Sequence, residues 1–358
     1  MTNALLEAAV SHPLAQATGW ALAHSVWQGA LVALAFAAAN WLLRESGAQA
    51  RYLAGCAALL LMVALPVTTV FVAGSSSPPA AQSRPMPSTN ATKGAETSPP
   101  AGSVGERLVT AVFFDRGRAE ESAAAPLAEW AGARFESLLP WLALAWAACV
   151  ALLAARLAGG WARASRMGRV RAGARDGVHE WEQTLARLSR RMKVGRAVRL
   201  CRSALVEVPT VVGWLRPVIL VPVGAMAGLS PAQVEAVLAH ELAHIRRHDY
   251  LVNLLQTVVE TALFFHPAAW WISGRVRAER EHACDDLAVE ATGDVLLYAR
   301  ALAALEESRQ GLRANELALA ANGGSLVRRI QRLIRMQPPN ARRAHAPAAL
   351  AAVALCCA

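Results

Sequence analysis

The stretch LSPAQVEAVLAHELAHIRRHD, residues 229–249, predicts a helix with a well-marked start. Ser230 can cap this helix, and Pro231 fits its first turn. Gln233 can complete a capping box with the serine, because it follows three residues later. The helical spacing then continues to about Arg247, within a run of charged residues.

The same helix carries the pattern HExxH at residues 240–244. Residues four apart project from one face of a helix, so the His240 and His244 imidazoles can converge on one tetrahedral zinc ion. Glu241 can reach the water on the metal and act as the general base, taking its proton and passing it to the leaving amine of a peptide bond. The pattern therefore predicts a metalloendopeptidase with one zinc ion per chain. The alternative is a polar helix in which HExxH arose by chance, and the capped start disfavours it.

A catalytic zinc ion usually has three protein ligands, so one more ligand must lie elsewhere. Helical spacing in RAEREHACDDLAVE, residues 277–290, places Glu281 and Asp285 on one face. We expect Glu281 to bind zinc and Asp285 to accept the free ring N–H of a ligating histidine. His282 and Cys284 are expected to point away from this face.

Three other residues are weaker candidates for the third ligand. Glu279 would take the place of Glu281 if the register of its helix were shifted. His248 would lie about 12 Å along an unbroken helix from His240, so a surface or outer position is expected. His266 precedes a proline in FFHPAAWW, and we expect it to begin a helix and to pack beside the tryptophans.

The composition indicates a membrane protein with a soluble part. Of the 358 residues, 55% are hydrophobic and 17% are charged, and the mean hydropathy is +0.30. Three apolar runs, at 19–43, 52–74 and 138–158, are long enough to cross a hydrocarbon core of roughly 30 Å. The expected fold class is a mainly α membrane protein with at least three transmembrane helices and an α+β zinc peptidase domain that contains a small sheet.

The sequence pattern divides the chain into six segments. They are a transmembrane hairpin (1–74), a largely disordered Pro/Ser/Ala-rich loop (75–136), a third transmembrane helix (137–160), the zinc metallopeptidase domain (161–324), a basic amphipathic juxtamembrane helix (325–345) and the start of a truncated or partial fourth membrane helix (346–358).

The distribution of charge predicts the orientation. The formal net charge is +10, and the basic excess follows the third apolar run. The positive-inside rule then places the N-terminus and the Pro-rich loop outside and the peptidase domain in the cytoplasm, at a bacterial inner membrane. The six cysteines form neither CxxC pairs nor a disulfide framework. No groove-reading motif accompanies the basic segments, so direct nucleic-acid binding is not expected.

Two stretches of the peptidase domain affect access to the metal. Residues 197–224 are rich in β-branched residues and punctuated by turns, which predicts two or three short strands. They form either a plain hairpin or a zincin-type sheet whose edge strand receives an extended peptide.

Residues 250–272 are nearly long enough to cross a membrane. If they did, His240 and Glu281 would lie on opposite sides, so we predict a helical hairpin, buried or dipping into the membrane, that returns to the same side.

Taken together, these motifs resemble the BlaR/MecR family of membrane zinc metallopeptidases, metallopeptidase family 56. The resemblance rests on HSVWQGALVAL, PTVVGWLRPVILVP, HELAHIRRHDYLVN, FFHPAAWW and EREHACDD, in this order. It implies a gluzincin-like site with His240, His244 and Glu281 as ligands and Glu241 as base. It also implies regulated cleavage of a cytoplasmic protein, either a transcriptional repressor or the chain itself.

Some members of that family sense β-lactams through an extracellular domain after the last span. This sequence stops inside the would-be fourth helix and has no SxxK sensor domain, so β-lactam sensing is not expected. Two further readings remain open: a housekeeping membrane protease of the HtpX or CaaX type, and a non-catalytic signalling scaffold with a structural zinc site. The expected partners are the lipid bilayer, a cytoplasmic protein substrate and a second copy of the chain.

Overall fold

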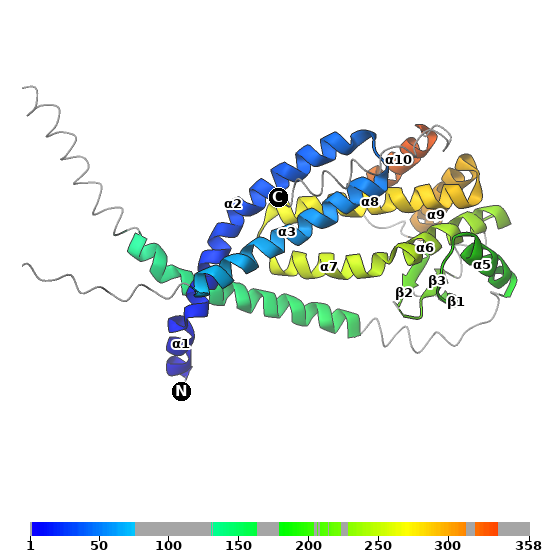
Figure 1. Ribbon diagram of the computed structural model, residues 1–358. Helices are drawn as coiled ribbons and strands as arrows, with labels where there is room; N and C mark the ends of the chain where they lie inside the picture. Colours follow the sequence, from blue (N-terminus) through cyan, green and yellow to red (C-terminus); the bar gives the residue numbers. More distant parts are fainter. Residues whose placement is uncertain are drawn as a thin grey trace, which may run out of the picture. The chain divides into compact units, whose positions relative to one another are not determined.

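The computed structural model is mostly helical, with one small sheet among the residues that it describes (Figure 1). The described residues are 2–75, 130, 132–162, 179–203, 206, 208–213, 215–222, 228–312 and 319–335. Most of the Pro-rich loop and the predicted partial fourth helix therefore lie outside them. The chain divides into two compact units, Met1–Ser25 with Pro66–Cys149 and Val26–Leu65 with Val150–Ala358.

Among the described residues, three helices are long and apolar enough to cross a membrane, as the sequence predicts. These candidate spans are Pro13–Glu45, Ala48–Val72 and Gly132–Ala162. The first comprises α2 (Pro13–Leu42) and the short 3₁₀ turn η1 (Leu43–Glu45), and the second lies in α3 (Ala48–Ser75). A short helix, α1 (Thr2–Ser11), precedes them.

Within the first unit, α2 packs closely against the third span. A side chain on Gly19 would collide with the backbone oxygen of Leu139, so only glycine allows this approach. One residue later, the rings of Trp20 and Phe135 meet edge to face with centroids 5.6 Å apart.

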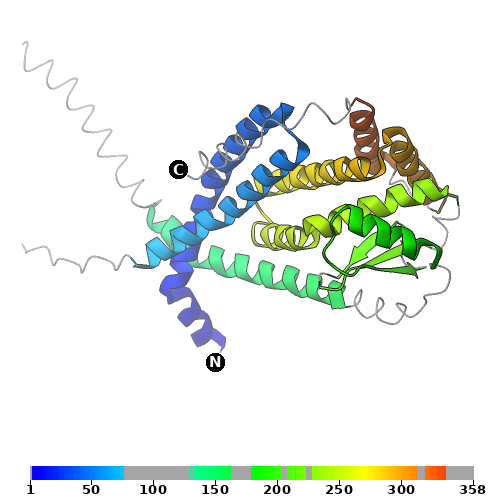
Figure 2. The ribbon, with the colours of Figure 1, turned by 45° about the vertical axis from the view of Figure 1, so that its right-hand side comes forward.

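The second unit contains the sheet and the helices that surround it. In chain order its elements are α5 (His179–Arg191), β1 (Arg199–Ser203), β2 (Thr210–Val212), β3 (Val218–Pro222), α6 (Pro231–Arg247), α7 (Asp249–Ala262), α8 (Pro267–Thr292), α9 (Val295–Leu312) and α10 (Leu319–Arg335). The strand order is β1-β3-β2, with β1 parallel and β2 antiparallel to β3. The small sheet is thus confirmed, and Figure 2 shows it beside α5 and α6.

The core of this sheet and helix layer is built around α6. Val234, Leu238 and Leu242 of α6 are fully buried, together with Ile219 of β3 and Leu188 of α5. Helices α8, α9 and α10 close the other side of this core. As a result, α6 is packed on several sides, and this packing fixes the directions of its polar side chains.

A second core joins the membrane hairpin to α7 and α8. Phe36 of α2 and Leu59 of α3 are buried with Val259 of α7 and Ile272 of α8. A turn at residues 263–266 interrupts the helix between α7 and α8, so the apolar stretch 250–272 forms parts of two helices and not one span. The predicted helical hairpin is confirmed.

The basic segment predicted after residue 325 belongs to helix α10 for the part that the structure describes. Helix α10 begins at Leu319, and two of its arginines pair with acidic residues of α8. Arg329 lies 2.6 Å from Asp285, and Arg332 lies 2.7 Å from Asp286. Leu333 is fully buried in the core. The residues after Arg335 lie outside the described part.

Candidate metal centre

The start of α6 has the cap that the sequence predicts. The Ser230 hydroxyl oxygen accepts from the Gln233 N–H at 3.3 Å, and the Gln233 side-chain oxygen accepts from the Ser230 N–H at 2.8 Å. Small residues on α6, Ala239 and Ala243, are fully buried. This allows the facing helices to come close to the histidines of the motif.

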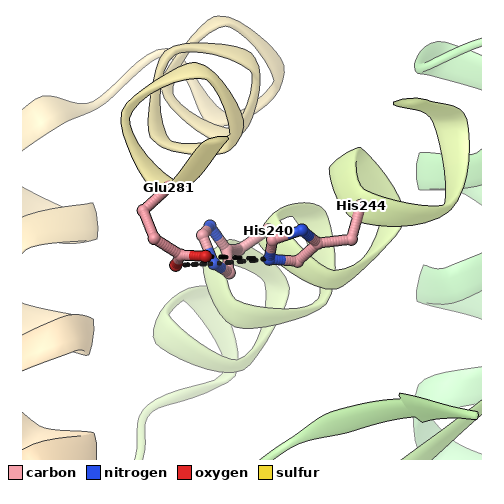
Figure 3. A group of neighbouring side chains, drawn as sticks. All are labelled: His240, His244 and Glu281. Carbon is pink, nitrogen blue, oxygen red and sulfur yellow. Dashed lines mark hydrogen bonds and ion pairs between the residues drawn. The ribbon is translucent and has the colours of Figure 1, made fainter. Parts of the chain in front are cut away.

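His240 and His244 project from α6 toward Glu281 of α8, and the three side chains converge (Figure 3). The two Nε2 atoms are 3.2 Å apart. A Glu281 oxygen lies 3.6 Å from His240 Nε2, and the other lies 4.0 Å from His244 Nε2. Ligand atoms on a tetrahedral zinc ion with bonds of about 2.1 Å are roughly 3.4 Å apart. The spacing of these donors and their His₂Glu chemistry therefore fit a zinc ion.

The outward ring nitrogen of His244 is held by Asp249, the first residue of α7. His244 Nδ1 lies 2.8 Å from Asp249 Oδ2. Although burial opposes it, the hydrogen bond to Asp249 raises the pKa of His244, with help from neighbouring carboxylates. Because Nδ1 is occupied in this way, Nε2 is directed at the metal position.

His240 is held differently, through a tyrosine. The Tyr298 hydroxyl of α9 donates a hydrogen bond to Asp285 Oδ1 at 2.6 Å. Its oxygen lies 2.8 Å from His240 Nδ1 and can accept a hydrogen bond from the N–H of that nitrogen. Asp285 itself is 3.5 Å from the same ring nitrogen. Asp285 thus acts on His240 mainly through Tyr298.

Arg329 of α10 joins this network to the third candidate ligand. It donates twice to Asp285, at 2.6 and 3.0 Å, and its remaining terminal nitrogen lies 3.3 Å from Glu281. Burial opposes ionisation of Asp285, but the Arg329 hydrogen bonds keep its pKa below the usual range. In Glu281, burial is likewise outweighed, here by the hydrogen bond and charge of His240, so its pKa is lowered. Both carboxylates are therefore held as anions.

Glu241 lies next to the ligands in a cavity of about 440 Å³. Its side chain is buried, and this burial raises its pKa above the ordinary value. Residues of β2, α9 and α10 also line the cavity. A carboxylate whose proton affinity is increased in this way suits a general base.

The structure places the three weaker candidates away from the ligand cluster. Glu279 lies 2.9 Å from Arg51 of α3. His248 ends α6 in the left-handed conformation, with φ of 60°, and lies at the edge of the cavity. His266 caps α8, where its Nδ1 accepts from the Ala268 N–H at 3.2 Å.

The expected orientation of Cys284 is wrong. Its sulfur lies 3.3 Å from both His244 Nδ1 and Asp249 Oδ2. The reason is that Cys284 follows Glu281 by three residues, which puts both on neighbouring parts of one helix face. Burial raises the pKa of the Cys284 thiol, so it remains protonated and donates to Asp249.

Three residues around the ligands were not found from the sequence: Asp249, Tyr298 and Arg329. Asp249 had a usable signal, because it ends the charged run directly after HExxH. Tyr298 and Arg329 belong to α9 and α10, far along the chain, and no local pattern marks them.

Comparison with known proteins identifies similar sequences. A family model described as BlaR1 peptidase M56 matches residues 25–333. Regulatory protein BlaR1 of Bacillus licheniformis is 34% identical over 88 residues, and methicillin resistance mecR1 protein of Staphylococcus aureus is 25% identical over 88 residues. Each match covers 25% of this chain but only 14% and 15% of those proteins. Protease HtpX homolog 2 of Methanosarcina acetivorans is 40% identical over 50 residues, which is 14% of this chain and 17% of that protein.

Proposed function

The chain belongs to the BlaR1 peptidase M56 family, and from this premise we propose that it is a zinc-dependent membrane endopeptidase that cleaves a cytoplasmic protein. One observation carries the proposal. His240, His244 and Glu281 present their ligand atoms to a common point, and Glu241 lines the same cavity.

When bound, the zinc ion would increase the acidity of a water molecule and polarise the peptide carbonyl. His240, His244 and Glu281 would hold the ion. Glu241 would take the proton of the attacking water and carry it to the nitrogen of the leaving amine. Its burial supports this role, because a raised pKa makes the carboxylate a better proton acceptor.

The position of β2 supports binding of an extended peptide. In the order β1-β3-β2, strand β2 is at the edge of the described sheet. Thr210 and Val211 of this strand line the cavity together with Glu241. A substrate segment could add to β2 by main-chain hydrogen bonds, which would bring one of its peptide bonds over the metal position.

We further propose that the peptidase unit faces the cytoplasm and acts in regulated proteolysis. The basic excess after the third span supports this orientation by the positive-inside rule. The name of one relative, regulatory protein BlaR1, favours a regulatory role. The substrate would be a transcriptional repressor or the chain itself, and the active form would be a monomer or a homodimer.

A housekeeping membrane protease is the second candidate. The match of 40% identity over 50 residues to protease HtpX homolog 2 favours it. The two functions differ in when cleavage occurs. Housekeeping cleavage would yield products under all conditions, whereas regulatory cleavage would yield few products and only under an inducing condition.

The test is a comparison of proteomes from cells that carry the wild-type chain or Glu241→Gln. The variant keeps the size of the side chain and the three ligands, so it should still bind zinc while losing cleavage. New protein termini that appear only with the wild type would identify the substrates and distinguish the two candidates. Identical termini under all conditions, with zinc bound in both proteins, would rule out the peptidase and favour a scaffold.

A further inference from the structure

The turn between α7 and α8, residues 263–266, lies beside the middle of α2. His266 Nε2 is 3.3 Å from the carbonyl oxygen of Val26. One helical turn further along α2, a side chain on Gly29 would collide with the same imidazole. This turn is the tip of the α7–α8 hairpin, and it therefore lies at the same level as this part of the first candidate span, Pro13–Glu45.

This register gives the depth of the tip. Near the end of the span, the Arg44 guanidinium lies 5.0 Å from the centre of the Trp41 ring, and such Trp and Arg residues are typical of the membrane boundary. Val26 precedes Trp41 by 15 residues, or roughly 22 Å along a helix that rises about 1.5 Å per residue. The hydrocarbon core is about 30 Å thick, so a point roughly 22 Å from its boundary is still inside it. The hairpin tip therefore lies at the level of the hydrocarbon core.

The other end of the hairpin lies at the boundary. Arg51 of α3 pairs with Glu279 of α8 at 2.9 Å, and the Tyr52 hydroxyl donates to Asp249 of α7 at 3.3 Å. Both contacts adjoin the turn between α2 and α3. The charged end of the hairpin, next to the candidate metal centre, is thus level with the end of the spans.

The surface of the tip is apolar. Every exposed residue from Thr257 to Gly274 is apolar, and Leu254 extends this surface by one helical turn. We call it the hairpin face; it consists of Leu254, Val258, Phe265, Pro267, Trp270, Trp271 and Gly274. The next exposed residue, Arg275, can extend its charged end toward the headgroups.

The polar groups of the tip are satisfied inside the protein. The Trp270 indole N–H donates to the Phe264 carbonyl oxygen at 2.9 Å. Glu260 is paired with Arg277, and Gln256 donates to the Ser273 hydroxyl at 2.7 Å. Internal pairing of this kind is what a low-dielectric surrounding requires, because a polar or charged group left alone there is costly.

We propose that the α7–α8 hairpin enters the bilayer from the side of the metal centre and returns to that side, with the hairpin face in contact with acyl chains. The hairpin face is exposed in the same unit as apolar residues of the first candidate span, such as Leu31 and Leu34, which are 56% and 70% exposed. Lipid that surrounds the span therefore reaches the hairpin as well. A second copy of the chain would instead cover the face with protein.

The experiment measures the depth of Val258 and Leu254 in the full chain. A genetically encoded fluorescent amino acid replaces one of them at a time, and the protein is reconstituted in vesicles of equal parts phosphatidylcholine and phosphatidylglycerol. Quenching is then recorded with nitroxide lipids labelled near the headgroup or near the end of the acyl chain, and with aqueous iodide. The same probe at Leu34 serves as the reference within a span, and at Leu215, 76% exposed beside the sheet, as the reference in water.

We expect the probes at Val258 and Leu254 to behave like the probe at Leu34, with at least about fivefold stronger quenching by deep nitroxide lipids than at Leu215. Quenching by iodide at the level seen for Leu215 would overturn the proposal. Protection from both iodide and nitroxide lipids would also overturn it, because the hairpin face would then be covered by protein. Two probe positions guard against a local disturbance, since each must report the same surroundings.

Discussion

Replacement of Asp249 tests whether the metal ligand His244 is held from outside the metal centre. In the structure the Asp249 carboxylate lies 2.8 Å from His244 Nδ1. Loss of such an outer partner typically costs 10- to 100-fold in metal affinity. In Asp249→Asn the amide oxygen can still accept from Nδ1–H, but without charge, and charged hydrogen bonds are roughly twice as strong as neutral ones.

We therefore expect about a tenfold loss of zinc affinity for Asp249→Asn and about a 100-fold loss for Asp249→Ala. These losses correspond to about 1.4 and 2.7 kcal/mol of binding free energy. The assay is competition for zinc between the purified full chain and a chromophoric chelator. A cobalt-substituted sample should also show a shifted visible spectrum, because the His244 ring changes its orientation.

The matched control is Asp286→Asn, which removes a carboxylate that pairs with Arg332 at 2.7 Å. This change should leave zinc affinity within about twofold of the wild type, since Asp286 is absent from the ligand cluster. The reasoning is refuted if both Asp249 variants bind zinc as tightly as this control while remaining folded.

Three further predictions follow from particular contacts. Removal of zinc with a strong chelator should abolish cleavage, and added zinc should restore it, as measured by the appearance of product termini. Arg329→Met leaves the fully buried Asp285 without its charged partner, so it should lower stability by about 3 to 5 kcal/mol in a denaturation experiment, while Arg335→Met at the exposed end of α10 should have a small effect. Gly19→Ala should destabilise the chain by about 1 to 3 kcal/mol in thermal unfolding, because the added methyl collides with the Leu139 backbone, whereas Gly160→Ala has open space and should be nearly neutral.

The sequence by itself determined the features that depend on neighbouring residues along the chain. The capping box at Ser230 and the spacing of His240 and His244 follow from helix geometry, which repeats every 3.6 residues. The three candidate spans follow from length and apolar composition alone. Glu281 was singled out as third ligand by its helical spacing to Asp285, and the structure places it beside both histidines.

Only the tertiary structure decided which distant helices meet at the metal centre. Tyr298 and Arg329 lie 58 residues from His240 and 44 residues from Asp285, respectively, and no local period reports such contacts. Helix α10 had the pattern of a membrane-surface helix, since its arginines and apolar residues alternate at helical spacing. That pattern is the same whether the arginines contact lipid phosphates or the carboxylates of α8, because both groups present negatively charged oxygens. In the structure Leu333 packs in the core and Arg329 pairs with Asp285, so this face of α10 contacts α8.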